Sequence, residues 1–174
     1  MNATIDPSLR FLGAHAELLV TLTHLSLFAK TVELLTEEQQ MINAGRFLEP
    51  LSSGFAEHHA DEEKLLFPNM LRLAKGAELD LVVSLSNRLT REHRAIETAW
   101  SRIEPTLITL TQTAGTPLDP LACTDLLERY RQHAKFEETV VLPLADRLFG
   151  DSGEFLDGQS GRFRHRIDNL PFYI

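Results

Sequence analysis

Two stretches of the sequence repeat one pattern: HHADEEKLLFP, residues 58–68, and HAKFEETVVLP, residues 133–143. Each has a histidine, a pair of glutamates that begins four residues later, and a proline ten residues after the histidine. This register aligns His58 with His133 and Glu62 with Glu137. Because residues four apart lie on one face of a helix, each stretch predicts a helical His–Glu pair that can reach a common site.

A further histidine lies on an apolar helical stripe before each stretch. His15 precedes the first stretch and His93 precedes the second. The chain therefore reads as two similar helical hairpins, each with a histidine in its first helix and a His–Glu pair in its second. Antiparallel packing of the two hairpins is expected to gather four imidazoles and two carboxylates at one level.

Apolar residues at helical spacing predict four long helices, over about 7–34, 36–76, 80–112 and 119–150. No stretch shows the alternation of a β-strand. Short connections between long amphipathic helices favour an all-α fold, an antiparallel up-down-up-down four-helix bundle. We expect residues 1–150 to form this bundle and residues 151–174 to form a tail that packs on it or is partly disordered.

Several residues predict where these helices begin and bend. Asp6 and Asp119, each followed by a proline, are typical N-caps, and Thr36 with Gln39 matches a capping box. Asp80 is expected to cap the third helix. Pro50 is expected to kink or split the second helix, because proline lacks the N–H that an α-helix needs.

Composition excludes several classes of protein. The 174 residues carry a formal net charge of −8 and no run of Lys or Arg, so a nucleic-acid partner is not expected. Cys123 is the only cysteine, which excludes an intrachain disulfide and suits a reducing compartment. The N-terminus does not resemble a signal peptide, and the apolar run 18–28 is too short to span a bilayer. We expect a cytoplasmic protein with no membrane partner.

Four imidazoles with two carboxylates predict a metal centre. This donor set suits iron, manganese or zinc better than calcium or magnesium. Two shared carboxylates can bridge two ions, so that each ion has four protein ligands and a solvent-derived bridge adds a fifth. The remaining position can accept O2, NO or peroxide. Glu62 and Glu137 carry much of this argument, because an unpaired carboxylate on an apolar stripe is costly to bury.

Neighbouring polar residues are assigned less specific roles. Glu63 and Glu138 are expected to face solvent or to contact the ligands, and Glu92 to be a proton relay, a supporting group or a solvated charge. His59 is a weaker extra candidate ligand, because one step along a helix turns it about 100° from His58. Four residues are expected to be structural or exposed: His24, Trp100, Tyr130 and His165.

The paired strings, with single histidines in the first and third predicted helices, resemble the signature of the hemerythrin-like, or HHE cation-binding, domain family over roughly residues 7–149. The resemblance implies a four-helix bundle around a non-haem di-iron centre with an oxo or hydroxo bridge. It implies bridging roles for Glu62 and Glu137. The other implied ligands are His15, His58, His93 and His133.

Oxygen-carrying hemerythrins have a fifth histidine one turn before the third-helix ligand, where this chain has Leu89. The sequence therefore looks more like the bacterial members of the family associated with nitric oxide, oxidative stress and iron–sulfur repair. We expect a protein that binds or senses O2 or NO, or that takes part in iron or oxidative and nitrosative stress responses. The alternative is a di-iron enzyme that reduces NO or peroxide, or donates iron for iron–sulfur repair.

Two further alternatives are weaker. A ferritin-like protein would use Glu-x-x-His pairs and more carboxylates than this chain offers. A metal-free bundle that binds other proteins would leave the repeated His–Glu pattern without a purpose. The sequence assigns no catalytic residue, and it leaves the metal in the cell, the physiological ligand, the redox partner and a homodimer as open alternatives.

Overall fold

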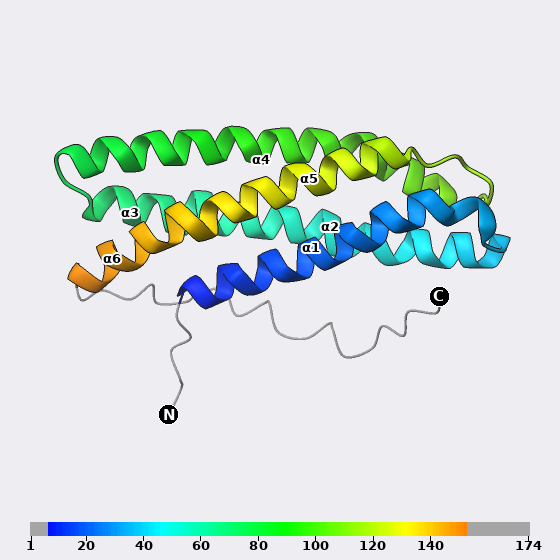
Figure 1. Ribbon diagram of the computed structural model, residues 1–174, viewed down its shortest axis with the longest axis horizontal. Helices are drawn as coiled ribbons and strands as arrows, with labels where there is room; N and C mark the ends of the chain where they lie inside the picture. Colours follow the sequence, from blue (N-terminus) through cyan, green and yellow to red (C-terminus); the bar gives the residue numbers. More distant parts are fainter. Residues whose placement is uncertain (1–6, 153–174) are drawn as a thin grey trace, which may run out of the picture.

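The computed structural model describes the backbone of residues 7–152 and the side chains of residues 11–150. Within these residues the fold is all-α, with no strand, and four long helical rods lie side by side (Figure 1). The first rod consists of α1 and a 3-10 turn: α1 Pro7–Thr31 and η1 Val32–Leu34. The third rod is the single helix α4, Ala77–Leu110.

The second and fourth rods each consist of three consecutive helical segments. The second contains α2 Glu37–Asp61, η2 Glu62–Leu66 and α3 Phe67–Leu73. The fourth contains α5 Pro120–Phe136, η3 Glu137–Val141 and α6 Leu142–Ser152. The tail predicted for residues 151–174 lies outside the described residues, except for the end of α6.

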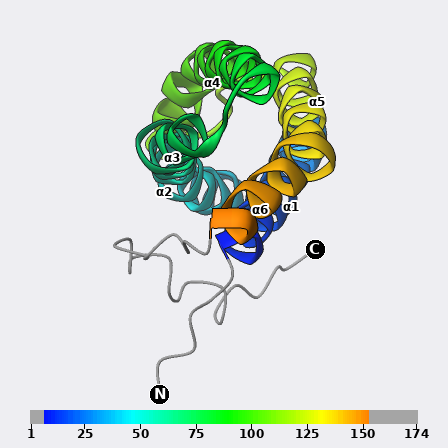
Figure 2. The same ribbon diagram turned by 90° about the vertical axis from the view of Figure 1, so that its left-hand side faces the viewer.

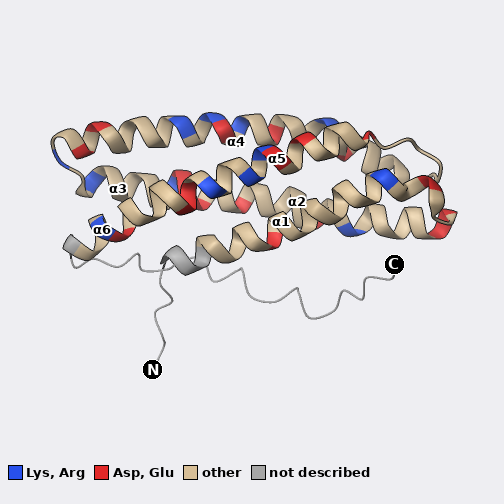
Figure 3. Cartoon of the chain, viewed as in Figure 1, with Lys and Arg blue, Asp and Glu red and all other residues tan. Residues whose placement is uncertain are grey.

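Each long helix packs against two others, so the rods surround a common core. α1 packs against α2 and α5, and α4 packs against the same two helices. Figure 2 shows this ring of rods from one end of the bundle. Figure 3 colours the basic and the acidic residues, and both kinds are interspersed along α4 and α5.

The caps predicted for the second and fourth helices are confirmed. The Thr36 hydroxyl accepts a hydrogen bond from the Gln39 N–H at 3.3 Å, and the Gln39 side chain accepts one from the Thr36 N–H at 3.0 Å. The Asp119 carboxylate accepts a hydrogen bond from the Leu121 N–H at 2.8 Å. The predicted Asp6 cap lies outside the described residues.

The cap predicted at Asp80 is wrong, and of the two outcomes predicted at Pro50 the split does not occur. Asp80 does not cap the third helix: α4 begins at Ala77, and Asp80 lies in its first turn, where a negative charge suits the helix dipole. The chain reverses earlier, at Gly76, whose φ of +56° is readily adopted only by glycine. Pro50 does not split the second helix, because α2 continues on both sides of it.

The π-helical segments η2 and η3 both begin at a glutamate of the repeated pattern. The Phe67 N–H donates to the Glu62 carbonyl, and the Leu142 N–H donates to the Glu137 carbonyl, five residues back in each case. A proline follows each donor, and its missing N–H makes the ordinary α-helical register less favourable there. Pro50 lies in a helix without a widened turn, so proline favours this geometry and does not dictate it. Each glutamate thus enters the core from a widened turn.

Helix α1 is unusually apolar. Within the described residues, the stretch Phe11–Leu34 is long and apolar enough to cross a membrane, by length and composition alone. It is longer than the run 18–28, which is by itself too short to span a bilayer. The core helix of a soluble bundle passes the same test. Leu22 and Leu25 are fully buried in the bundle, whereas Val20 and Leu27 are more than half exposed.

The core consists of two apolar clusters with a polar layer between them. The first cluster includes Leu22, Phe55 and Trp100, and the second includes Phe67, Leu89 and Leu148. In the first three rods the predicted metal ligands lie between the residues of one cluster and those of the other. In the fourth rod Glu137 lies between the clusters, and His133 lies at the edge of the first, next to Ala134. The bundle therefore surrounds the polar layer with apolar side chains on both sides.

Candidate metal centre

The structure brings all six predicted site residues together in the polar layer. Every one of them is at most 2% exposed. They come from four rods: His15 from α1, His58 from α2, Glu62 from the start of η2, His93 from α4, His133 from α5 and Glu137 from the start of η3.

The six residues form two overlapping groups, each compact enough to hold a cation. In each group, one possible ligand atom per residue lies within 4.8 Å of the others. The first group contains His15 and His58, the second contains His93 and His133, and both contain the two glutamates. This sharing is the arrangement expected for two ions bridged by two carboxylates.

In the first group the imidazoles of His15 and His58 face each other. Their Nε2 atoms lie 3.0 Å apart. His15 Nε2 is 2.8 Å from Glu137 Oε2, and His58 Nε2 is 3.4 Å from Glu62 Oε1. Two imidazole nitrogens this close need a proton or a cation between them, because two bare lone pairs repel.

In the second group the same two glutamates meet the other pair of imidazoles. His93 Nε2 lies 2.9 Å from Glu62 Oε2 and 4.0 Å from Glu137 Oε1. His133 Nε2 lies 3.5 Å from Glu137 Oε1. Each glutamate therefore approaches both imidazole pairs.

Most of these inward atoms lack a hydrogen-bond partner. By hydrogen-bond geometry both carboxylate oxygens of Glu62 and of Glu137 are buried without a partner, and so are the Nε2 atoms of His93 and His133. Two of these oxygens nevertheless lie close to an imidazole nitrogen, Glu137 Oε2 at 2.8 Å and Glu62 Oε2 at 2.9 Å. Leaving buried charged groups unsatisfied costs several kcal/mol. Cations such as iron would satisfy these oxygens and nitrogens together, so the residues present fit a two-ion centre.

The pKa shifts of the buried residues are also consistent with a cation site. Burial and the charge of Glu137 raise the pKa of Glu62 well above its usual value. Burial also acts on Glu137, but the charge of His133 and contacts with His15 and His93 hold its pKa well below the usual value. Burial lowers the pKa of His93, yet the carboxylates of Glu137 and Glu62 raise it to about 10. Without metal the cluster therefore retains protons, which an incoming cation must displace.

Three glutamates outside the cluster hold the outer ring nitrogens of the imidazoles. Glu138 lies 3.0 Å from Nδ1 of His15, and Glu63 lies 2.8 Å from Nδ1 of His93. Glu92 lies 3.2 Å from Nδ1 of His133. An imidazole that donates Nδ1–H to a carboxylate presents a bare Nε2 to the interior, as metal-ligating histidines generally do. Of the roles that the sequence left open for Glu63, Glu92 and Glu138, the structure shows contact with the predicted ligands.

The carboxylates around the second imidazole pair are neutralised by arginines at the surface. Arg88 pairs with Glu92 at 2.7 Å. Arg94 pairs with both Glu63 and Glu97, each at 2.7 Å. The hydrogen bond from His133 and the pairing with Arg88 lower the pKa of Glu92. The pairing with Arg88 therefore keeps Glu92 ionised and able to accept a hydrogen bond from His133.

Sequence reasoning missed Glu97 and Arg94 and gave little weight to His59. His59 is 2% exposed, and its Nδ1 lies 3.1 Å from Oε1 of Glu97. Glu97 follows His93 by four residues, the same spacing as in the repeated pattern, and that spacing was an available signal. Leu89 is fully buried in the second apolar cluster, at the position where oxygen carriers are expected to have a histidine.

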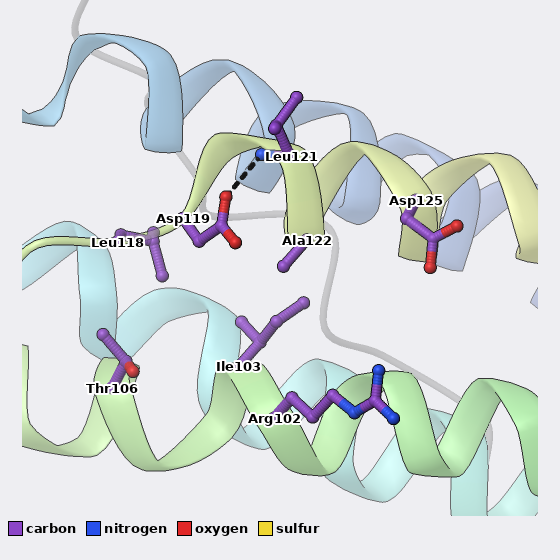
Figure 4. A pocket seen from close by; sticks show the side chains of 8 residues that line it. All are labelled: Arg102, Ile103, Thr106, Leu118, Asp119, Leu121, Ala122 and Asp125. Atoms are coloured by element: carbon purple, nitrogen blue, oxygen red, sulfur yellow. Dashed lines mark hydrogen bonds between the residues drawn. The ribbon is translucent and has the colours of Figure 1, made fainter.

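The larger of two pockets described at the surface lies away from this centre. It has a volume of about 410 Å³ and lies between α4 and the start of α5, with Ile103, Leu118 and Asp119 in its wall (Figure 4). Its lining contains no histidine and no residue of the cluster. The six residues of the centre are themselves buried.

A comparison with known proteins agrees with this geometry. No curated protein and no solved structure gives a match. Residues 11–145 match the hemerythrin HHE cation-binding domain, which covers more than half of the chain. The chain belongs to the hemerythrin HHE cation-binding domain family.

Proposed function

We propose that this protein holds two iron ions in the cluster and that the centre binds O2 or NO, as a sensor or as part of a stress response. The first ion has His15 and His58 as ligands, the second has His93 and His133, and both share the two glutamates. Manganese or zinc suits the same donors. The observation that carries the proposal is the set of four buried carboxylate oxygens without hydrogen-bond partners between two imidazole pairs.

The setting of the site supports a binding role. The ligands come from every rod of the helical bundle, and an apolar cluster lies on each side of them. With four protein ligands and a solvent-derived bridge, each octahedral ion keeps one position for a ligand, and iron supplies reversible binding of O2 or NO there. The proposal includes a cytoplasmic location, with no nucleic-acid or membrane partner, and leaves a homodimer as an alternative to a monomer.

Iron loading tests the proposal directly. The purified protein is loaded with ferrous iron without oxygen, and bound iron per chain is measured after gel filtration. We expect two ions in the wild type and about one in His58→Ala and in His133→Ala, because each change removes a ligand from one ion only.

His24→Ala is the matched control, since this histidine is on α1 but belongs to none of the possible metal groups. It should keep both ions. A wild type that takes up no iron, manganese or zinc contradicts the proposal, and so does loss of iron in the control alone.

An enzyme is the second candidate, favoured by Tyr130. Its side chain is fully buried, its hydroxyl has no hydrogen-bond partner, and its ring centroid lies 6.2 Å from that of His15 and 6.0 Å from that of His133. A phenol in this position can donate a proton to a reacting molecule. In stopped-flow spectra with O2, NO and peroxide, an enzyme should return to its starting state over many turnovers and slow down in Tyr130→Phe. A binding protein should show a single binding event.

A further inference from the structure

His59 is buried beside the cluster, on the side of His93 and His133. Its ring stacks on that of His93, with centroids 4.0 Å apart and planes 5° from parallel, and it meets the ring of His133 edge-on at 5.9 Å. One ring nitrogen of each of these three histidines lies within 4.8 Å of the other two. His59 is thus as close to the second imidazole pair as a ligand would be.

The tautomer of His59 follows from its outer contact. An ionised carboxylate only accepts hydrogen bonds, so the 3.1 Å contact with Glu97 places the proton on Nδ1 of His59. Arg94 pairs with Glu97 and keeps it ionised. In the neutral ring Nε2 then carries a bare lone pair, and this atom is buried without a hydrogen-bond partner. A buried acceptor of this kind is unfavourable unless something fills it.

The stacked geometry argues against direct ligation of the same ion. Two imidazoles that share an ion aim their nitrogens at one point about 2.1 Å away. Parallel stacked rings point in one direction instead. Arg94 bridges the carboxylates that hold Nδ1 of His93 and Nδ1 of His59, so the two Nε2 atoms share the opposite, inner side. His93 therefore faces the ion, and His59 faces the space next to it.

We propose that His59 accepts a hydrogen bond, through Nε2, from a small molecule bearing an O–H group that binds beside the ion held by His93 and His133. The inference rests on the proposed two-ion centre and adds a ligand class to O2 and NO. A peroxide-like molecule satisfies the lone pair of His59, whereas an anion without a proton, such as azide, does not. In the repeated pattern Ala134 stands where the first stretch has His59, so the other side of the centre lacks this acceptor.

The test compares two probes on the full-length chain loaded with ferric iron. Hydrogen peroxide is the probe with an O–H group, and azide is the probe without one. Binding of each is followed by optical titration or stopped-flow absorbance, after bound iron has been measured. We expect His59→Leu to keep its iron and to weaken peroxide binding about tenfold relative to azide, the effect of one hydrogen bond.

His59→Gln is the matched variant, because its amide can donate to Glu97 and its carbonyl can accept from the ligand. It should restore most of the preference for peroxide. Equal weakening of both probes in His59→Leu, no change in either, or a loss of iron would overturn the inference. A wild type that binds no iron overturns the proposed function as well, and the iron assay shows this before either probe is added.

Discussion

His15 and His58 lie on one side of the shared glutamates, and His93 and His133 lie on the other. When the two hairpins are aligned on these histidines, Glu63 corresponds to Glu138. Glu63 holds Nδ1 of the first-helix histidine in the opposite hairpin, and Glu138 does the same in return. The repeated pattern therefore specifies the inner ligands and one supporting carboxylate for each half.

The two hairpins differ in residues near the first-helix histidines, His15 and His93. Glu92 precedes His93 and contacts His133, whereas Ala14 precedes His15 and offers no such group. Glu97 has Leu19 as its counterpart in the first hairpin. The extra polar groups thus gather around one imidazole pair. The two halves thus have equivalent ligands, whereas Glu92, Glu97 and His59 have no polar counterparts on the other side of the centre.

The largest effect should come from the residues that both halves share. Glu62→Gln or Glu137→Gln is expected to reduce bound iron from about two ions per chain to fewer than one, because each carboxylate serves both ions. The measurement is iron per chain after anaerobic loading, with His58→Ala alongside. If a glutamine variant retains one full ion, as the histidine variant should, the carboxylates are not shared.

A smaller effect should separate the two sides. Glu92→Ala is expected to weaken only the ion held by His93 and His133, by about 10- to 100-fold, because the ligand loses the carboxylate that orients it. Glu138→Ala should weaken the other ion. Titration with ferrous iron against a competing chelator resolves the two binding steps. Weakening of the same step by both variants would contradict the assignment of one imidazole pair to each ion.

The smallest effect concerns the metal-free protein and His59, which has alanine as its counterpart in the second hairpin. Burial and the neighbouring His93 lower the pKa of His59 from 6.5 to about 3. Because the unfolded chain takes up this proton first, the free energy of unfolding should fall as the pH drops below 6.5. At pH 5 the shift amounts to roughly 2 kcal/mol.

Urea unfolding of the chelator-treated protein at pH 7 and pH 5 measures this loss. His59→Gln should lose roughly 2 kcal/mol less than the wild type between the two values. An equal loss in both proteins would show that His59 is already charged in the folded state.

Much of the site could be predicted because a duplicated helical pattern fixes which side chains share a face. The His58–Glu62 and His133–Glu137 pairs needed only helical spacing, and burial of His15 and His93 followed from their apolar stripes. Contacts between different rods were harder to predict from the sequence. Whether Glu97 meets His59 depends on how α4 packs against α2, which spacing along one helix does not specify.

The helix boundaries show the same limit. Thr36 caps α2 through groups three residues apart, so the sequence alone was sufficient. Asp80 had a suitable side chain, but Gly76 reversed the chain earlier. The widened turns η2 and η3 could not be predicted either, since Pro50 shows that a proline within a helix does not produce one by itself.

These widened turns hold one residue more than an α-helical turn. A π-helical turn absorbs an inserted residue locally, so the helices on either side keep their buried faces. Leu66 and Val141, the last residues of the two turns, and Met70 and Ala145, four residues further on, all remain in the core. A chain one residue shorter at each turn could pack the same four rods without presenting its glutamates in the same way. The additional residue in each turn thus coincides with the point at which a glutamate of the cluster enters the core.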